Sequence, residues 1–118
     1  MTSSFNDVVA LPHSIEAETA VLGLILRTPE KFTYVVDKTS LKPEYFFVEK
    51  HKKIYALICD LDNNNNPIDI VSLGERLYAA GSSSDSINPA FLVRLTEECP
   101  LAQNIEYYAE IICKKYYL

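Results

Sequence analysis

The sequence predicts an all-α domain, a compact orthogonal bundle of about six short helices. Six prolines divide the 118 residues into stretches of ordinary helix length. Within these stretches apolar residues recur at spacings of three and four, and no strand alternation or Asn-Gly hairpin turn interrupts them. Because 48% of the residues are apolar, a chain of this length can bury a real core. We therefore expect one folded domain and exclude a disordered chain.

The first expected helix runs from an N-cap at Ser14 to about Leu26. Glu16 and Glu18 fall in its first turn, where the helix dipole favours negative charge. One stripe is expected to face the core, because its apolar residues follow the spacing i, i+4, i+7, i+8. The stripe comprises Ala17, Val21, Leu24 and Ile25.

The second expected helix begins at Thr28-Pro29, a cap followed by proline at the first helical position, and ends near Ser40. A short aromatic turn, Tyr45-Phe46-Phe47, then precedes a third helix from about Glu49 to Leu61. We expect both helices to bury apolar side chains at helical spacing. These are Phe32, Val35 and Val36 in the second helix, and Ile54, Leu57, Ile58 and Leu61 in the third.

Three further helices are expected in the second half of the chain. Asp69 is the expected cap of the fourth, which ends at Gly81 in a left-handed conformation. Asn88-Pro89 predicts the start of the fifth, and the sixth begins at Ala102 or Asn104. The apolar positions expected to face the core are Ile70, Val71, Leu73 and Leu77, then Phe91, Leu92 and Leu95, then Ile105, Tyr108, Ala109 and Ile112.

The charge distribution argues against a nucleic-acid partner for this chain alone. Residues 60–118 hold nine acidic and four basic side chains, which accounts for the whole net charge of −5. Binding to phosphates draws most of its affinity from cations. The one weak candidate is the basic run Lys50, Lys52 and Lys53, for which an ordinary solvated surface is the competing interpretation. His51, within this run, is expected to pack beneath the aromatic turn.

Motifs for catalysis, cofactors and metals are missing from the sequence. None of the three glycines belongs to a phosphate-binding G-x-x-x-x-G-K-[ST] loop, so we expect no nucleotide site. The cysteines Cys59, Cys99 and Cys113 are far apart and form no C-x-x-C, so they are expected to be core residues in a reducing compartment. The longest apolar run, Val21 to Leu26, is too short for a membrane span. We expect a soluble intracellular protein.

Five blocks of sequence resemble, in order, the N-terminal domain of bacterial replicative DNA helicases of the DnaB type. Together they span residues 12 to 112 at compatible spacing. At one departure, Leu101 stands where that family usually has serine or threonine, which makes Asn104 the expected cap of the last helix. The blocks are Pro12–Glu18 with Val21-Leu22-Gly23; Pro43-Glu44-Tyr45-Phe46; His51 with Ile54-Tyr55; Pro67-Ile68-Asp69-Ile70-Val71; and Pro100 with Asn104-Ile105, Tyr108-Ala109 and Ile111.

The resemblance implies a non-catalytic domain of a larger enzyme. The parent would be a hexameric helicase that unwinds DNA at the replication fork, with ATP, magnesium and DNA bound through a C-terminal RecA-like domain. This chain would form the assembly collar and the docking surface for the primase C-terminal domain, in the bacterial cytoplasm or the plastid stroma. Residues 1–11 would be a flexible segment, residues 12–103 the globular head, and residues 104–118 the start of a truncated hairpin helix.

The resemblance also suggests contact residues. Phe91 and Leu92 would contact primase, although a core position for Phe91 is the competing interpretation. Another helical interaction module, such as the primase C-terminal domain itself, is the alternative function. The residues suggested as contacts between helicase subunits are Tyr107, Tyr108, Tyr116 and Tyr117.

Overall fold

The computed structural model describes residues 14–84, 87–99 and 102–117, and over these ranges it contains helices and no strand. The expected all-α fold is confirmed. The segment 1–11, expected to be flexible, lies outside the described residues. The α-helices of the described ranges are α2 (Ile15–Arg27), α3 (Lys31–Thr39), α4 (Glu49–Asn63), α5 (Ile70–Ala79), α6 (Pro89–Glu97) and α7 (Ile105–Tyr116), with single 3-10 turns η1 (Pro43–Tyr45) and η2 (Ala102–Asn104).

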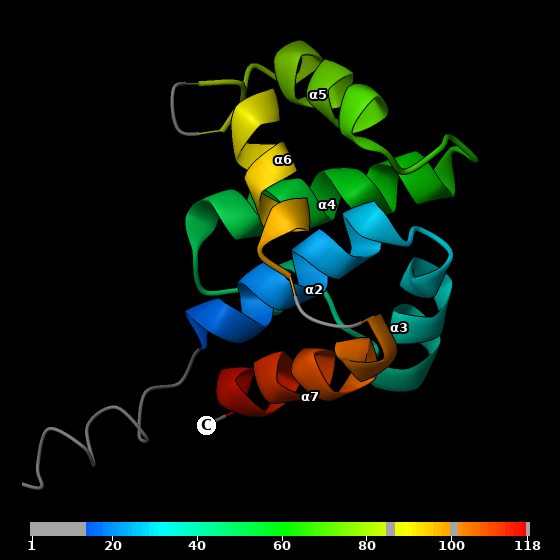
Figure 1. Ribbon diagram of the computed structural model, residues 1–118, viewed down its shortest axis with the longest axis vertical. Coiled ribbons are helices and arrows are strands. Elements are labelled where there is room, and N and C mark those ends of the chain that lie inside the picture. The colour runs from blue at the N-terminus through cyan, green and yellow to red at the C-terminus, as the bar shows by residue number, and fades with distance from the viewer. Residues whose placement is uncertain (1–13, 85–86, 100–101, 118) are drawn as a thin grey trace, which may run out of the picture.

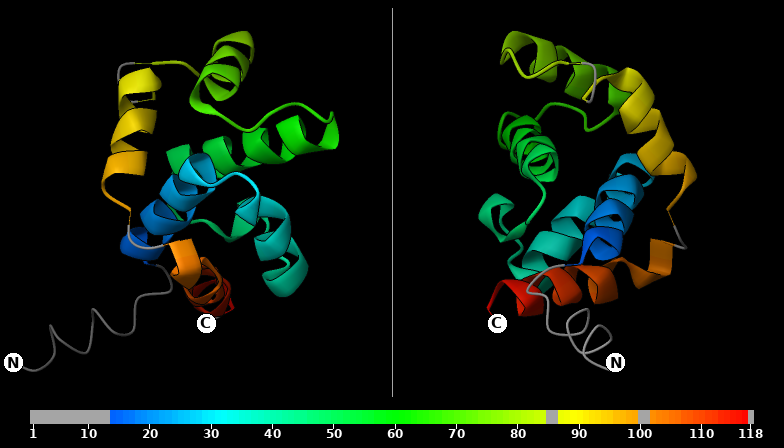
Figure 2. Two further views of the ribbon diagram at one scale, coloured as in Figure 1. Left: turned by 45° about the vertical axis from the view of Figure 1, so that its right-hand side comes forward. Right: turned by 90° about the vertical axis from the view of Figure 1, so that its left-hand side faces the viewer.

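Helix α2 lies at the centre of the bundle and contacts α3, α4, α6 and α7. Figure 1 shows α5 and α6 at one end of the molecule and α3 and α7 at the other, with α2 and α4 between them. Both views in Figure 2 keep α7 beneath α2. The central position explains why α2 is the most apolar helix: Val21, Leu22, Leu24 and Ile25 are all fully buried.

Three of the expected helix caps are confirmed. The Ser14 side chain accepts a hydrogen bond from the Ala17 amide at 3.2 Å. Asp69 accepts one from the Ser72 amide at 2.7 Å. Asn88 in turn accepts one from the amide of Phe91 at 3.0 Å, with Pro89 at the first helical position. Each cap satisfies an amide that the first helical turn would otherwise leave without a partner.

Two predicted helix starts are wrong in detail. Helix α3 begins at Lys31, because the residues from Thr28 to Glu30 form a turn and the Thr28 amide ends α2 by bonding to the Leu24 carbonyl at 2.8 Å. Asn104 stands at the cap position of α7, but its side chain makes no capping hydrogen bond. The turn η2 leads into this helix instead.

The core contains most of the expected apolar positions, with a few exceptions. Val71 is 76% exposed, whereas Leu73 and Leu77 of α5 are buried and Ile70 packs partly buried against the core. The three cysteines are half-buried at the edge of the core rather than inside it. No helix in the described part of the chain is both long and apolar enough to cross a membrane.

Helices α2 and α6 approach each other closely at Gly23. A β-carbon added there would lie 2.8 Å from the Cys99 β-carbon and would also collide with the Leu95 carbonyl oxygen. Only glycine permits this approach of backbone to backbone. The contact fixes the position of α6, which carries one of the candidate surfaces described next.

Candidate functional site

Phe91 and Leu92 are neighbours in the first turn of α6 but have different surroundings. Leu92 is fully buried in the core, so its side chain is not available to a partner. The Phe91 ring is half-buried at the surface. A primase contact at this place would therefore use Phe91 and not Leu92.

Two cations lie over the Phe91 ring. The Lys50 amine, from the start of α4, is 4.3 Å from the ring centroid, and the Arg94 guanidinium carbon, one turn further along α6, is 5.8 Å from it. Both distances are within the range in which an aromatic face attracts a cation. The ring also borders a groove of about 370 Å³, whose other lining residues include Ile15, Val48, Leu95 and Glu98.

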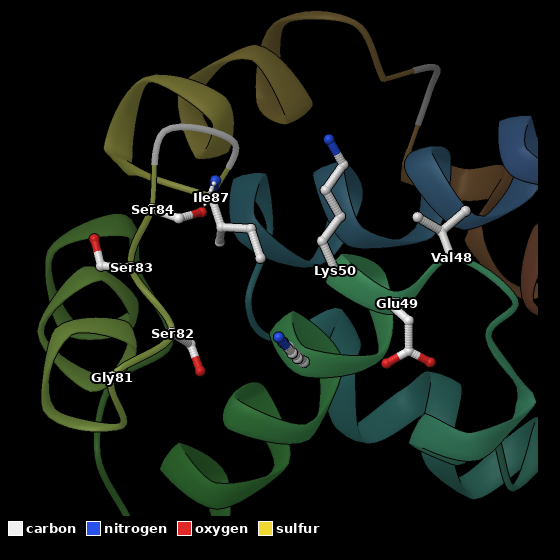
Figure 3. A pocket seen from close by; sticks show the side chains of 9 residues that line it. Val48, Glu49, Lys50, Gly81, Ser82, Ser83, Ser84 and Ile87 are labelled. Carbon is white, nitrogen blue, oxygen red and sulfur yellow. Dashed lines mark hydrogen bonds between the residues drawn. The ribbon is translucent and has the colours of Figure 1, made fainter.

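Two of the three lysines of the basic run, Lys50 and Lys53, line the same hollow, and Lys52 does not. Lys50 lies over Phe91, whereas Lys52 forms an ion pair with Glu49 at 3.2 Å. Lys53 lines, together with Lys50, a hollow of about 450 Å³ between the start of α4 and the loop of Ser82, Ser83 and Ser84. Figure 3 shows the Lys50 side chain pointing away from the helix on the opposite side from the Glu49 carboxylate. Residues three apart lie side by side on a helix, so Lys53 lies next to Lys50, whereas Lys52 points to another side of α4.

His51 belongs to the interior and not to the basic surface. Its Nδ1 lies 2.8 Å from a carboxylate oxygen of Glu18, and both side chains are buried. Glu18 also accepts hydrogen bonds from the amides of Phe47, at 2.7 Å, and Val48, at 3.3 Å. The carboxylate thus joins α2 to the segment that leads into α4. This pair is structural, because every polar contact that it makes joins parts of the fold.

The four tyrosines of α7 form two groups. Tyr107 is 64% exposed and makes an edge contact with Tyr108, which is half-buried. Tyr116 stacks on Tyr45 with ring centroids 4.4 Å apart, and the hydroxyls of Tyr117 and Tyr45 are 2.7 Å apart. The hydrogen bond with Tyr117 raises the pKa of Tyr45 to about 12. The second group thereby fixes the end of α7 to η1 and still leaves Tyr117 exposed.

Metal-ligating side chains are dispersed over the described ranges, which contain no group of three or more His, Cys, Asp or Glu residues that could hold a metal ion. The cysteines are free thiols there. Burial raises the pKa of Cys59 to about 11, and burial also raises the pKa of Cys113. A protonated thiol is a poor nucleophile, so Cys59 lacks the character of a reactive site.

Cys59 is expected to react slowly with iodoacetamide at pH 8. With a pKa near 11, about one thiol in a thousand is ionised at that pH, against about one in four at the ordinary pKa of 8.5. The ionised fraction should therefore rise by more than about a hundredfold, and the reaction rate with it, when the chain is unfolded in urea, as measured by mass spectrometry of the Cys59 peptide. Equal rates in the folded and unfolded chain would contradict the raised pKa.

Comparison with known proteins identifies the family. The model of the DnaB-like helicase N terminal domain matches residues 10–114, nearly the whole chain. The chain belongs to this family. The match confirms the sequence resemblance and decides against the alternative of a primase C-terminal domain.

Relatives of this DnaB-like domain are replicative helicases. The chain is 34% identical over 115 residues to the replicative DNA helicase DnaC of Bacillus subtilis, covering 98% of this chain and 25% of the relative. It is 33% identical over 104 residues to the replicative DNA helicase DnaB of Rhodothermus marinus, covering 88% of this chain and 11% of that protein. The chain thus spans a quarter or less of the length of these curated relatives.

A solved structure has the same fold as this DnaB-like domain. The crystal structure of the N-terminal domain of DnaB helicase from Mycobacterium tuberculosis matches with a TM-score of 0.83 and 29% sequence identity. The match covers 91% of this chain and 75% of that one.

Sequence reasoning missed the long-range contacts of this DnaB-like domain. Glu16 and Glu18 are both acidic residues in the first turn of α2, and only the fold shows that Glu18 is buried and Glu16 exposed. The contact between Lys50 and Phe91 joins residues 41 positions apart and has no local signal. Helical geometry alone, however, predicts that Lys50 and Lys53, three residues apart, lie on one side of the helix and Lys52 on another.

Proposed function

We propose that this chain is a non-catalytic N-terminal head of a hexameric replicative helicase, where it contributes to the assembly collar and docks the primase C-terminal domain. The family match over residues 10–114 is the observation that carries the proposal. The relatives are named as replicative DNA helicases, and their greater length leaves room for a motor domain outside this region. ATP, magnesium and DNA would be bound there. The bacterial relatives favour the bacterial cytoplasm over the plastid stroma.

We assign subunit contacts to α7 in the same proposal. One side of this helix closes the core through Ile105, Ala109 and Ile112, which are buried against the bundle. Its exposed tyrosines, Tyr107, Tyr116 and Tyr117, lie outside the core. Exposed aromatic side chains of this size favour contact with another protein surface. Residues 104–118 would thus complete the head and begin the hairpin that pairs subunits.

Primase docking is assigned to the surface around Phe91. A recognition surface between helical proteins needs an apolar anchor surrounded by polar side chains. Phe91 meets this requirement because its half-buried ring borders a groove and has Lys50 and Arg94 over it. Leu92 supports the anchor from within the core, where it is fully buried.

Replacing Phe91 with alanine is expected to weaken binding of the primase C-terminal domain by about 2 kcal/mol, roughly thirtyfold in Kd. The free energy of unfolding should fall by less than about 3 kcal/mol, because this ring is half-exposed. Removal of a fully buried phenylalanine side chain typically costs about 3–5 kcal/mol. Calorimetric titration and thermal melting of the same variant measure the two effects. Val93→Ala, an exposed apolar residue of α6, is the matched control and should change neither. A variant that no longer folds would assign Phe91 to the core and remove it from the docking surface.

A further inference from the structure

The groove beside Phe91 has a local positive charge that the acidic chain does not have as a whole. Lys50 and Arg94 lie over the ring from two different helices, whereas the net charge of the chain is −5. Lys53 is close by, since the hollow that it lines shares Val48 and Lys50 with the groove. Glu98 is the acidic side chain that lines the groove.

Lys50 and Arg94 also lack a carboxylate partner among the described residues. Within the described ranges neither forms an ion pair with a carboxylate, whereas Lys52 pairs with Glu49 and Arg76 pairs with Asp60. Figure 3 shows that the Glu49 carboxylate, next in sequence to Lys50, points away from the Lys50 amine. Over the ring, the two cations contact an aromatic face in place of a counter-ion.

The walls of the groove are apolar between these charges. Ile15, which is 51% exposed, lines it from α2, and Leu95 lines it from α6. An apolar channel favours a partner that inserts aliphatic side chains, and the two cations favour carboxylates beside them. Single-stranded nucleic acid would also offer negative charge and one base to stack on Phe91, but the other apolar walls are aliphatic and give successive bases no stacking surface.

We propose that the groove between α2, α4 and α6 binds an acidic amphipathic helix, whose aliphatic side chains pack against Phe91 and Ile15 and whose carboxylates pair with Lys50 and Arg94. This inference rests on the proposed function to the extent that the primase domain supplies the helix. It adds the chemistry of the partner surface. Lys50 and Arg94 then determine the charge of the partner, and Phe91 provides the apolar anchor.

Two synthetic helical peptides of about 18 residues, five helical turns, test the proposal. They share a leucine stripe and carry glutamate or lysine at the remaining positions. The glutamate peptide should bind the whole chain at least tenfold more tightly than the lysine peptide, and its affinity should fall with added salt. Fluorescence anisotropy measures both, with an oligonucleotide of twenty thymidines as a third ligand. Equal binding of the two peptides, or tighter binding of the oligonucleotide, would overturn the proposal.

Charge reversal locates the site. The double variant Lys50→Glu/Arg94→Glu should lose at least tenfold in affinity for the glutamate peptide, with unchanged helix content and melting temperature. Lys52→Glu reverses one charge on another side of α4, as each replacement of the double variant does in the groove, and should have less than a twofold effect. If both variants bind as the wild type does, the groove is not the site. A primase domain that fails to bind while the glutamate peptide binds would reject the proposed function and leave this inference standing.

Discussion

Replacing Gly23 with alanine is expected to lower the free energy of unfolding by about 3 kcal/mol or more, at the upper end of overpacking effects. The new β-carbon would collide with the Leu95 carbonyl oxygen, a backbone atom that moves only if α6 moves. For a domain of this size, the loss corresponds to a melting temperature lower by about 10 °C. Circular dichroism during thermal unfolding measures it.

Gly74→Ala is the matched control for Gly23. This glycine also lies within a helix, α5, but the nearest atom to an added β-carbon is the Pro89 Cγ at 4.0 Å. Alanine there should stabilise the domain by about 0.5–1 kcal/mol, because glycine is the poorer helix former. If the two variants shifted the melting temperature in the same direction, the close contact between α2 and α6 would be disproved.

Glu18→Ala is expected to destabilise the domain by about 3–5 kcal/mol, the range for removing one partner of a buried polar pair. The carboxylate accepts hydrogen bonds from the Phe47 and Val48 amides and lies 2.8 Å from the His51 ring nitrogen. Alanine removes an acceptor that these three groups share, at a site that water does not reach. Urea unfolding followed by circular dichroism measures the effect.

Glu16→Ala controls for the helix-dipole effect. Glu16 lies in the same first turn of α2 but is exposed, so its replacement should lower the free energy of unfolding by about 1 kcal/mol or less. Glu18→Gln keeps one oxygen acceptor and should fall between the two alanine variants. Equal losses for Glu16→Ala and Glu18→Ala would show that the buried hydrogen bonds contribute nothing beyond the dipole.

Local signals in the sequence predicted the fold well, because most helix starts depend on a few adjacent residues. Ser14, Asp69 and Asn88 cap helices in the structure as expected, each with its own hydrogen bond to an amide three residues later. The helix start predicted from Thr28-Pro29 is wrong for a physical reason. The Thr28 amide is used to end α2, so the chain needs a further turn before α3 begins.

The candidate site was less predictable, because it depends on which residues the fold brings together. Leu92 and Phe91 are adjacent in sequence, yet only the packing of α6 on α2 decides which of them is buried. The placement of Lys50 over Phe91 requires α4 and α6 to be near each other, and no spacing in the sequence encodes that. The tyrosines of α7 were identified from sequence, but their partner Tyr45 lies 71 residues before Tyr116 and was missed.

The central position of α2 has a consequence for the order in which the chain can fold during synthesis. This helix begins at Ile15, but α7, which covers one of its faces, begins about 90 residues later. At a synthesis rate of about 5–20 residues per second, α7 is made roughly 5–20 s after α2, and the face of α2 that α7 covers stays exposed for that time. One face of the most apolar helix of the domain therefore stays exposed until the end of this region is synthesised, and a chaperone that binds aliphatic segments is expected to recognise it.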